Sequence, residues 1–318
     1  MKKVYFRADA SANIGYGHFV RTLALADILK DNFDCIFFTC HPTLYQIKEM
    51  GKVCRYVALD SKTHFDDFLS SLQGDEIVVL DNYFYHTEYQ REIKNKGCKL
   101  VCIDDIHDKH YVADVLINPS LTDVSLFDVE PYTNLCLGFE WMLLRKAFLD
   151  SERLRKTVNI SNVCLCFGGS DYCNLTDKFI NILLKKDGIT NVFAIIGDKY
   201  PGSGLCSDSR VSFLHNLSSD CMVNIFNNTD LAILPTSTVC LEALACSTPV
   251  AAGYFVDNQI EDFINFSVQG LIYPLGNLVT LEEQGINWDA MSVFAISQNV
   301  KVNNKCIMKN YLNLFDNI

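Results

Sequence analysis

The sequence predicts an α/β protein made of two doubly wound halves, each with a parallel sheet, and three observations support this prediction. Short apolar runs rich in Val, Ile, Phe and Tyr alternate with longer helical patterns from one end of the chain to the other. This alternation pauses at a charged stretch near residues 150 to 158 and then restarts. A length of 318 residues, of which 49% are apolar, favours two domains over one. Strands that alternate with helices indicate parallel sheets with helices on both faces.

Six apolar runs predict the strands of the first half: KVYFR, CIFFTC, CRYVAL, EIVVLDNY, KLVCIDD and DVLINPS. Helical patterns separate most of them, at roughly residues 17 to 30, 43 to 51, 63 to 73 and 87 to 96. Six further runs predict the strands of the second half: NVCLCFGG, VFAIIGD, VSFLHN, LAILP, PVAAGYF and GLIYPLG. We therefore expect domains over 1–155 and 156–318, with a cleft between them. Ligands of such sheets bind at the carboxyl ends of the strands.

Composition excludes several classes of protein. A formal net charge of -11 gives no general footprint for nucleic acid or an anionic membrane. The 14 cysteines are scattered without a CxxC pair, which is typical of buried thiols in a reducing cytoplasm. The first residues lead into a strand pattern and not into a signal peptide, and no apolar run approaches the length of a membrane span. We expect a cytoplasmic monomer without a nucleic-acid partner.

The first glycine loop lies between the strand KVYFR and a helix with apolar residues at helical spacing. Gly15 and Gly17 allow close backbone approach, and free amides at a helix start attract anions. His18 follows at the helix N-terminus, where the helix dipole favours the neutral imidazole that a general base needs. The alternative is a tight turn with a partly buried capping histidine. The loop lacks the dinucleotide fingerprint, because position 20 is Val.

A second glycine loop, CLCFGGSDYCNLT, opens the second half with the same order of strand, loop and helix. Gly168 and Gly169 allow close approach of a ligand, and Ser170 or Asp171 can cap the helix. We expect all four residues to bind substrate.

A third loop of this kind lies in LAILPTSTVCLEAL, where hydroxyls and amides at a helix start suit a diphosphate. The hydroxyls belong to Thr236, Ser237 and Thr238. Glu242 lies one turn after Thr238 on the same face, which suits a ribose diol. The alternative is a capped helix with a surface Glu.

Polar residues also follow other strands. Asn258 and Gln259 come directly after PVAAGYF, where their amides can bind sugar hydroxyls or acetamides, although such pairs also form plain turns. Asp81 and Tyr83 end a strand of the first half.

One group of residues suggests a metal site, formed by Asp104, Asp105, His107 and His110. The two acids close a strand while the histidines fall in a loop, and no matching ligand set occurs elsewhere. We expect no metal and no other cofactor, and we expect these carboxylates to bond backbone or orient their neighbours.

Taken together, these motifs resemble one family. The segments RADASANIGYGHFVRTLALA, LDNY, IDDIHDKHYVADVLINPSL, LGFEWMLLR, FGGSDYCNLT, STVCLEAL and DNQ occur in the order seen in PseG-like proteins. These are UDP-2,4-diacetamido-2,4,6-trideoxy-β-L-altropyranose hydrolases of pseudaminic acid biosynthesis. The resemblance runs to about residue 275, and the tail after about residue 276 has no recognisable family motif.

The resemblance implies a GT-B-like architecture related to MurG-type glycosyltransferases, with two Rossmann-like domains facing a central cleft. It implies metal-independent hydrolysis of a UDP-sugar at the anomeric carbon with inversion, releasing UDP. The first domain would hold the sugar and the catalytic histidine, and the second would bind UDP. His18, Tyr83 and Asn258 match the family's catalytic positions. The matched segments add further expected substrate-binding residues: Arg7, Asp9, Gly15, Gly17, Arg21, Asp81, Ser237, Thr238, Glu242 and Gln259.

Three other functions stay open at this point. A glycosyltransferase of the same fold would use His18 to activate an acceptor hydroxyl, but no basic amphipathic stretch marks a membrane-facing patch in the first half. A binding protein would keep the pocket without turnover. A nicotinamide oxidoreductase is disfavoured because neither half shows the fingerprint followed by a ribose-binding acid.

Overall fold

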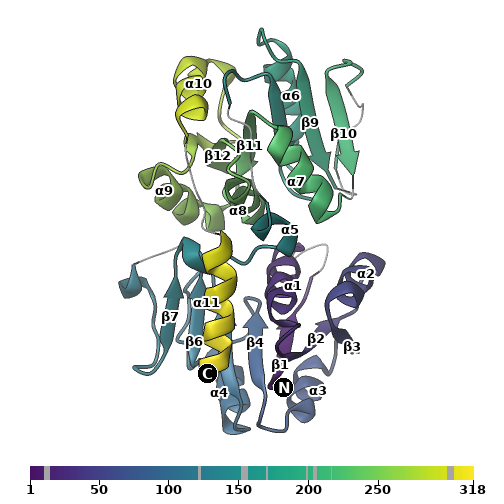
Figure 1. Cartoon of the computed structure of the whole chain (residues 1–318), viewed down its shortest axis with the longest axis vertical. Coiled ribbons are helices and arrows are strands. Elements are labelled where there is room, and N and C mark those ends of the chain that lie inside the picture. The colour runs from purple at the N-terminus through teal and green to yellow at the C-terminus, as the bar shows by residue number, and fades with distance from the viewer. Residues whose placement is uncertain are drawn as a thin grey trace. The chain divides into compact units, whose positions relative to one another are not determined.

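The computed structural model describes residues 1–10, 15–120, 123–151, 157–169, 171–197, 200–202, 206–215, 217–298 and 304–318. It divides into two compact units (Figure 1). Unit 1 comprises Met1–Leu149 and Asn303–Ile318, and unit 2 comprises Asp150–Val302. No helix in these described ranges has the length and apolar character needed to cross a membrane.

Unit 1 is a seven-stranded sheet in the order β3-β2-β1-β4-β5-β6-β7, and every neighbouring pair is parallel. The strands are β1 Lys3–Ala8, β2 Asp34–Cys40, β3 Arg55–Leu59, β4 Ile77–Asp81, β5 Lys99–Ile103, β6 Val115–Asn118 and β7 Asn134–Leu137. The helices are α1 Gly17–Leu29, α2 Leu44–Val53, α3 His64–Ser71, α4 Thr87–Asn95, α5 Lys146–Leu149 and α11 Asn304–Asn317, with short 3-10 turns η1 Val124–Leu126 and η2 Phe139–Trp141.

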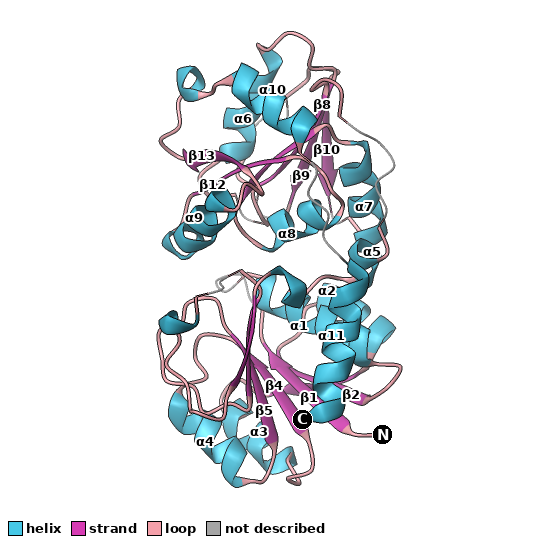
Figure 2. Cartoon of the chain, turned by 60° about the vertical axis from the view of Figure 1, so that its left-hand side comes forward, coloured by secondary structure: helices cyan, strands magenta, loops and turns pink. Residues whose placement is uncertain are grey.

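Helices cover both faces of this sheet, with α1 and α11 on one face and α3 and α4 on the other (Figure 2). The central strands are therefore mostly apolar, as is typical of parallel strands buried on both faces. All five residues of β4 and all four of β6 are buried. The edge strand β3 exposes four of its five residues.

Unit 2 repeats this plan with a six-stranded parallel sheet in the order β10-β9-β8-β11-β12-β13. The strands are β8 Asn162–Cys166, β9 Asn191–Ile196, β10 Val211–His215, β11 Leu231–Pro235, β12 Val250–Tyr254 and β13 Tyr273–Asn277. The helices are α6 Leu175–Leu184, α7 Ser219–Asn228, α8 Thr238–Ala245, α9 Ile260–Val268 and α10 Trp288–Ser297, with turns η3 Asp257–Gln259 and η4 Glu283–Gly285. The α/β prediction of two Rossmann-like halves is thus confirmed.

The last helix departs from the expected division of the chain. Sequence spacing assigned 156–318 to one domain, but α11 belongs to unit 1. Buried aromatic side chains hold it there: Phe315 packs on Phe33 with ring centroids 6.1 Å apart, and the Tyr311 hydroxyl donates to the Trp141 carbonyl at 2.5 Å. The expectation was wrong for these residues because the pattern of a helix does not reveal which sheet it covers.

Candidate functional site

The candidate site of unit 1 lies where the strand order reverses. β1 and β4 are neighbours in the sheet, while the chain leaves them toward opposite edges, and this is the place where open α/β sheets bind ligands. Asp9 follows β1, Asp81 is the last residue of β4, and His18 stands in the first turn of α1. The three predicted residues therefore meet at the carboxyl edge of the sheet.

His18 forms the central contact of this group. Its Nδ1 lies 2.7 Å from Asp81 Oδ1, and both side chains are buried, with 5% and 0% of their surfaces exposed. α1 begins at Gly17 without a side-chain cap and without an acid in its first turn, so the histidine is the first polar side chain of the helix. Gly15 has a φ of +81°, a conformation that favours glycine.

The contacts of Asp81 determine which nitrogen of His18 holds the proton. Asp81 Oδ1 is a carboxylate oxygen and can only accept, so Nδ1 must donate to it. Arg21 Nη2 also donates to that oxygen, at 2.6 Å. Nη2 and Nδ1 lie 3.1 Å apart because both donate to the same Asp81 oxygen, and they do not bond each other. In the neutral ring, Nε2 then has the free lone pair, and it bonds no residue in the described part of the chain. This is the arrangement of a general base.

Asp81 receives four hydrogen bonds in all. Arg21 Nε donates to Oδ2 at 2.7 Å and the Thr22 hydroxyl donates to the same oxygen at 2.8 Å. Burial alone would raise the pKa of the Asp81 carboxyl, but the charge and hydrogen bonds of Arg21, with those of His18, hold it well below its usual range. Asp81 is therefore an ionised, fully buried carboxylate.

Tyr83 and Asp105 complete the group. The Tyr83 ring meets the His18 ring edge-on, with centroids 4.6 Å apart and planes at 83°. Its hydroxyl donates to Asp105 Oδ2 at 3.3 Å, and Arg21 Nη1 donates to the same oxygen at 2.8 Å. Tyr83 is 37% exposed, so it can meet a ligand, whereas Arg21 has all three guanidinium nitrogens engaged by acids.

Arg7 and Asp9 form a second buried pair beside this group. Arg7 is fully buried, and its two terminal nitrogens donate to the two Asp9 oxygens at 2.5 and 2.8 Å. The amide of Cys40 also donates to Asp9 Oδ1, at 2.7 Å. Asn82 links the Arg7–Asp9 pair to the His18 group, because it follows Asp81 in the chain and its Oδ1 accepts from the Asp9 amide at 2.7 Å. With Arg7 buried, we expect it to hold Asp9 in place and not to touch substrate.

Two sets of residues have the composition of a metal site. Ligand atoms of Asp9, Cys40 and His64 lie within 4.8 Å of one another. However, Arg7 Nη2 stands among them, 2.8 Å from Asp9 Oδ2, 2.9 Å from His64 Nδ1 and 3.4 Å from Cys40 Sγ. The guanidinium already supplies the positive charge, so these residues do not fit a metal ion.

The four possible ligands that the sequence suggested bond different partners. Asp104 accepts from the Tyr111 hydroxyl at 2.7 Å and from the amide of His107 at 2.8 Å. His110 instead pairs with Asp128, at 2.8 Å. Asp105 bonds Arg21 and Tyr83, as described above. The carboxylates thus bond backbone and orient neighbours, which is the alternative that the sequence favoured.

Unit 2 places its first glycine loop directly after β8, at the point where the order of its own strands reverses. Gly168 has a φ of +86°, and a side chain on Gly197 would collide with the Gly169 carbonyl, which explains the glycines there. Asp171 is buried, and its two oxygens accept from the amides of Leu175 and Thr176, both at 2.8 Å. Ser170 lies outside the described residues.

These bonds correct one expectation. Asp171 caps α6, as the sequence suggested it could, but as a cap it already fills the place where a ligand anion would bind. The first amides of α6 are therefore not open to a diphosphate, and Asp171 itself has both oxygens engaged.

The start of α8 differs in this respect. Ser237 is the N-cap residue in extended backbone, makes no side-chain cap hydrogen bond, and no acid stands in the first turn. Ser237 and Thr238 are partly exposed, so their hydroxyls and the first amides can meet an anion. Thr236 is buried and its hydroxyl donates to the Gln259 carbonyl at 2.9 Å. Glu242 is 4% exposed, so it is not the surface acid of the alternative interpretation.

Asn258 and Gln259, the two amide side chains that follow β12, lie in different environments. Gln259 is buried and its Oε1 accepts from the Phe255 amide at 3.0 Å, so it shapes the loop. Asn258 is exposed on η3. Within unit 2 the Thr236 bond to Gln259 joins this loop to the start of α8.

The structure therefore brings His18, Arg21, Asp81 and Tyr83 together, with the Arg7–Asp9 pair beside them, and sequence reasoning did not assign two further members to this group. Asp105 was considered as a possible metal ligand or as a carboxylate that orients its neighbours, but not as a member of this group, and Thr22 was not considered. The signal for Thr22 was its position four residues after His18, on the same face of the helix. The partner of Asp105 is Arg21, 84 positions away, and no spacing in the sequence indicates such a pair.

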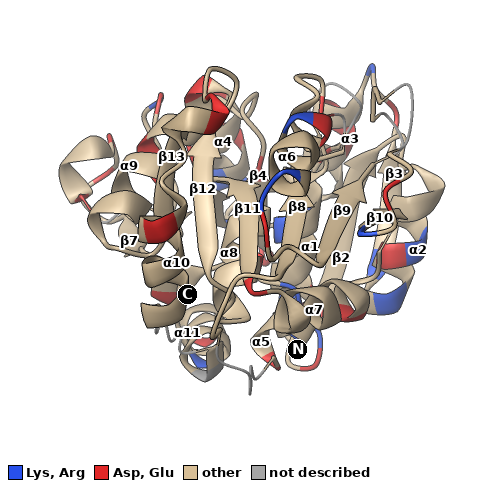
Figure 3. Cartoon of the chain, turned by 90° about the horizontal axis from the view of Figure 1, so that it is seen from above, with Lys and Arg blue, Asp and Glu red and all other residues tan. Residues whose placement is uncertain are grey.

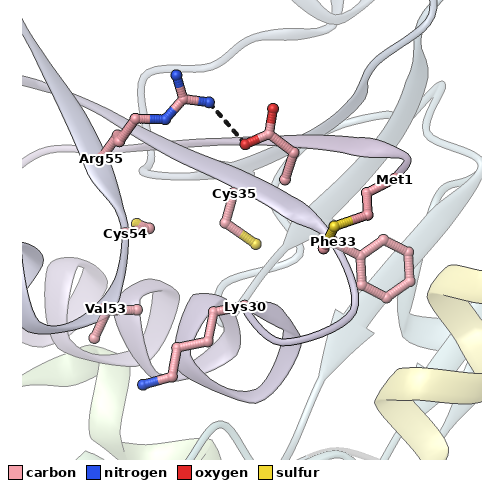
Figure 4. Close-up of a pocket in the computed structure, with 8 residues that line it drawn as sticks. Met1, Lys30, Phe33, Cys35, Val53, Cys54 and Arg55 are labelled. Carbon is pink, nitrogen blue, oxygen red and sulfur yellow. Dashed lines mark hydrogen bonds and ion pairs between the residues drawn. The ribbon is translucent and has the colours of Figure 1, made fainter.

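A separate depression lies at the opposite edge of the unit 1 sheet, where β2 and β3 begin (Figure 4). Arg55 points there toward Asp34, 2.7 Å away. No residue of the His18 group lines this depression. Figure 3 shows basic residues among acidic ones over many elements, in keeping with the net charge of -11.

Comparison with known proteins gives two relatives of low identity. No family model matches the sequence. An uncharacterized protein of Methanocaldococcus jannaschii is 26% identical over 288 residues, which are 83% of this chain and 58% of that relative. The chain thus spans less than two thirds of its length. The UDP-2,4-diacetamido-2,4,6-trideoxy-beta-L-altropyranose hydrolase of Campylobacter jejuni is 24% identical over 275 residues, 81% of this chain and 93% of that enzyme.

Solved structures match over nearly the whole chain. MurG of Acinetobacter baumannii aligns with a TM-score of 0.62 at 12% identity, covering 98% of this chain and 100% of MurG. UGT89C1 of Arabidopsis thaliana, solved in complex with UDP, aligns with a TM-score of 0.63 at 12% identity, covering 99% and 100%. At such identities the likeness shows the fold alone. The chain has two Rossmann-like α/β units of the GT-B type.

Proposed function

We propose that the protein is a nucleotide-sugar hydrolase of pseudaminic acid biosynthesis, which cleaves a UDP-2,4-diacetamido-2,4,6-trideoxy sugar and releases UDP. The observation that supports this best is the His18–Asp81 pair at the strand-order reversal of unit 1, in which Nδ1 is held by an ionised carboxylate. The hydrolase of Campylobacter jejuni, 24% identical, supports the choice of substrate.

In the proposed reaction His18 Nε2 takes a proton from water, and the water oxygen attacks the anomeric carbon. The bond between that carbon and the diphosphate oxygen breaks, and its electron pair leaves with UDP. Attack from the face opposite the leaving group inverts the anomeric configuration. The Nδ1–H bond to Asp81 keeps the ring in the required tautomer.

Unit 2 is assigned the UDP part of the substrate. The uncapped start of α8 offers amides and the hydroxyls of Ser237 and Thr238 to a diphosphate, which can stabilise its developing charge without a metal. We assign Tyr83 and Asn258 to the sugar because both are exposed and hold polar groups. The cofactor-free, metal-independent reaction is part of this proposal.

The test is turnover of UDP-2,4-diacetamido-2,4,6-trideoxy-β-L-altropyranose in H₂¹⁸O with EDTA and without an acceptor. The proposal predicts ¹⁸O in the free sugar and an inverted anomer in the first NMR spectra. His18→Gln should lower kcat by about 10²- to 10⁴-fold, while His110→Gln, a change at an exposed His–Asp pair, should not. Unlabelled sugar or normal turnover of the His18 variant would refute the mechanism.

A glycosyltransferase is the second candidate, because MurG and UGT89C1 share the fold over nearly the whole chain. In that case His18 would take its proton from an acceptor hydroxyl. UDP binding without hydrolysis in the labelled-water experiment, followed by turnover when an acceptor sugar is supplied, would favour this function.

A further inference from the structure

The Asp81 carboxylate binds His18 and also a cation, the guanidinium of Arg21. Asp81 Oδ1 accepts from His18 Nδ1 at 2.7 Å and from Arg21 Nη2 at 2.6 Å, and Arg21 Nε binds the other oxygen. One guanidinium charge thus neutralises the one negative charge of Asp81. A neutral pair gives little electrostatic support to an imidazolium, so Asp81 alone does not supply the charge that a histidine base needs.

Asp105 supplies a second negative charge to the group formed by Asp81 and Arg21. Its Oδ2 lies 2.8 Å from Arg21 Nη1, on the side of the guanidinium away from Asp81, and its side chain is 28% exposed. The group of Asp81, Arg21 and Asp105 therefore has a net charge of one negative unit. Among the described residues, the polar groups that face His18 are Arg21 from α1, Asp81 from β4 and the Tyr83 ring from the loop after β4.

The same oxygen of Asp105 also fixes geometry. It accepts from the Tyr83 hydroxyl at 3.3 Å, and the Tyr83 ring packs edge-on against His18. A single carboxylate oxygen thus holds both the arginine that binds Asp81 and the tyrosine that borders the imidazole.

We propose that Asp105 is a positioning residue of the reaction, which supplies the excess negative charge of the His18 site and holds Arg21 and Tyr83 in place. This inference rests on the proposed function, in which His18 is the base.

Asp105→Asn separates charge from shape, because the amide oxygen of the new side chain still accepts from Arg21 and Tyr83. With the excess charge gone, the imidazolium is less favoured. The acid limb of the kcat/KM profile should move to lower pH by about one unit, and the plateau should fall about tenfold because the base is weaker. Asp105→Glu keeps the charge and should leave the acid limb at its wild-type position.

The experiment compares pH profiles of wild type, Asp105→Asn, Asp105→Glu and the control Asp128→Asn, which removes the same charge from an exposed acid that pairs with His110. The ring nitrogens of His18, assigned by their loss in His18→Gln, are titrated in parallel by ¹⁵N NMR. We expect a shift of both readouts in Asp105→Asn and none in the control. If Asp105→Asn does not fold, Asp105→Gln gives a neutral side chain with an acceptor oxygen, and Asp105→Glu is its charged match of equal length.

The outcomes separate the two proposals. Wild-type protein that does not hydrolyse the UDP-sugar refutes the proposed function, and the NMR titration still decides whether Asp105 sets the charge at His18. Wild-type turnover with unchanged profiles and unchanged NMR titration in Asp105→Asn overturns the role of Asp105 and leaves the hydrolase standing.

Discussion

Asp81 shows at the scale of one residue how a buried charge is tolerated. Three neighbours donate four hydrogen bonds to its two oxygens, and none of its surface is exposed. A buried carboxylate costs free energy unless such partners compensate it, and removing its charge leaves Arg21 paired with Asp105 alone. The residues of the proposed reaction are therefore also expected to contribute to the stability of unit 1.

We predict that Asp81→Asn lowers the free energy of unfolding by about 3 kcal/mol at pH 7. The folded-state pKa of Asp81 is depressed, so its contribution is complete above the unfolded-state pKa of about 4 and is lost as pH falls below it. The difference between wild type and variant should therefore shrink between pH 5 and pH 2.5. Urea unfolding at several pH values measures it.

Asp128→Asn is the control for this prediction, because Asp128 is 74% exposed and pairs only at the surface with His110. Its effect on unfolding should be below about 1 kcal/mol. A difference between wild type and Asp81→Asn that stays constant down to pH 2.5 would show that Asp81 is not ionised through a depressed pKa.

Sequence reasoning could place His18, Asp81 and Tyr83 in one site, because each follows or ends a strand and such ends meet at one edge. It could not predict that Asp81 and Asp105 would accept from all three guanidinium nitrogens of Arg21. That result depends on which strands are neighbours: β1, β4 and β5 lie side by side, so Arg21 of α1 contacts Asp105, 84 positions away. Spacing along the chain does not contain this information.

At the scale of elements, two helices of unit 2 begin in similar positions but differ in their first turns. α6 starts with its amides bonded to Asp171, and α8 starts without a side-chain cap. Both follow glycine- or hydroxyl-rich loops, so the sequence predicted the same role for each. The burial of Asp171 decides the difference, because its carboxylate turns back onto the helix.

We predict that Asp171→Ala lowers the free energy of unfolding of unit 2 by about 1 to 2 kcal/mol, the usual cost of a lost helix cap. Asp171→Asn is the matched variant, since Asn keeps one acceptor oxygen and tolerates the positive φ of 35° at this position. It should retain most of the stability. Equal losses in both variants, measured by urea unfolding, would contradict the cap.

The strands were predictable because each central run is apolar on both faces, as in β4 and β6. The exception is β7, which sequence analysis did not predict. It has only four residues, one of them buried, and it lies at the sheet edge, so its pattern resembles a loop. Edge strands of this length give a weak signal.

At the scale of the whole molecule, the last helix determines the integrity of unit 1. Tyr311 is fully buried, its ring lies 5.4 Å from that of Trp141, and its hydroxyl bonds the Trp141 carbonyl. The sequence predicted a second domain up to residue 318 because nothing in the pattern of α11 distinguishes its own sheet from the other.

We predict that Tyr311→Ala lowers the free energy of unfolding of unit 1 by about 3 to 5 kcal/mol. Tyr311→Phe keeps the ring and loses one hydrogen bond, so it should cost about 1 kcal/mol. Hydrogen exchange resolved by peptide reports each unit separately and avoids assuming one transition. Faster exchange in β8 to β12 than in β1 to β6 for Tyr311→Ala would contradict this assignment of α11.

Unit 1 is discontinuous in the chain, with all of unit 2 inserted before α11. During synthesis the residues of β1 to β7 leave the ribosome long before residues 304 to 317 exist. Phe33 and the other apolar residues that α11 covers therefore stay uncovered until α11 has been synthesised, whereas all of unit 2 is synthesised before α11. Unit 1, whose first strands are synthesised first, can therefore complete its packing only after all of unit 2 has been synthesised.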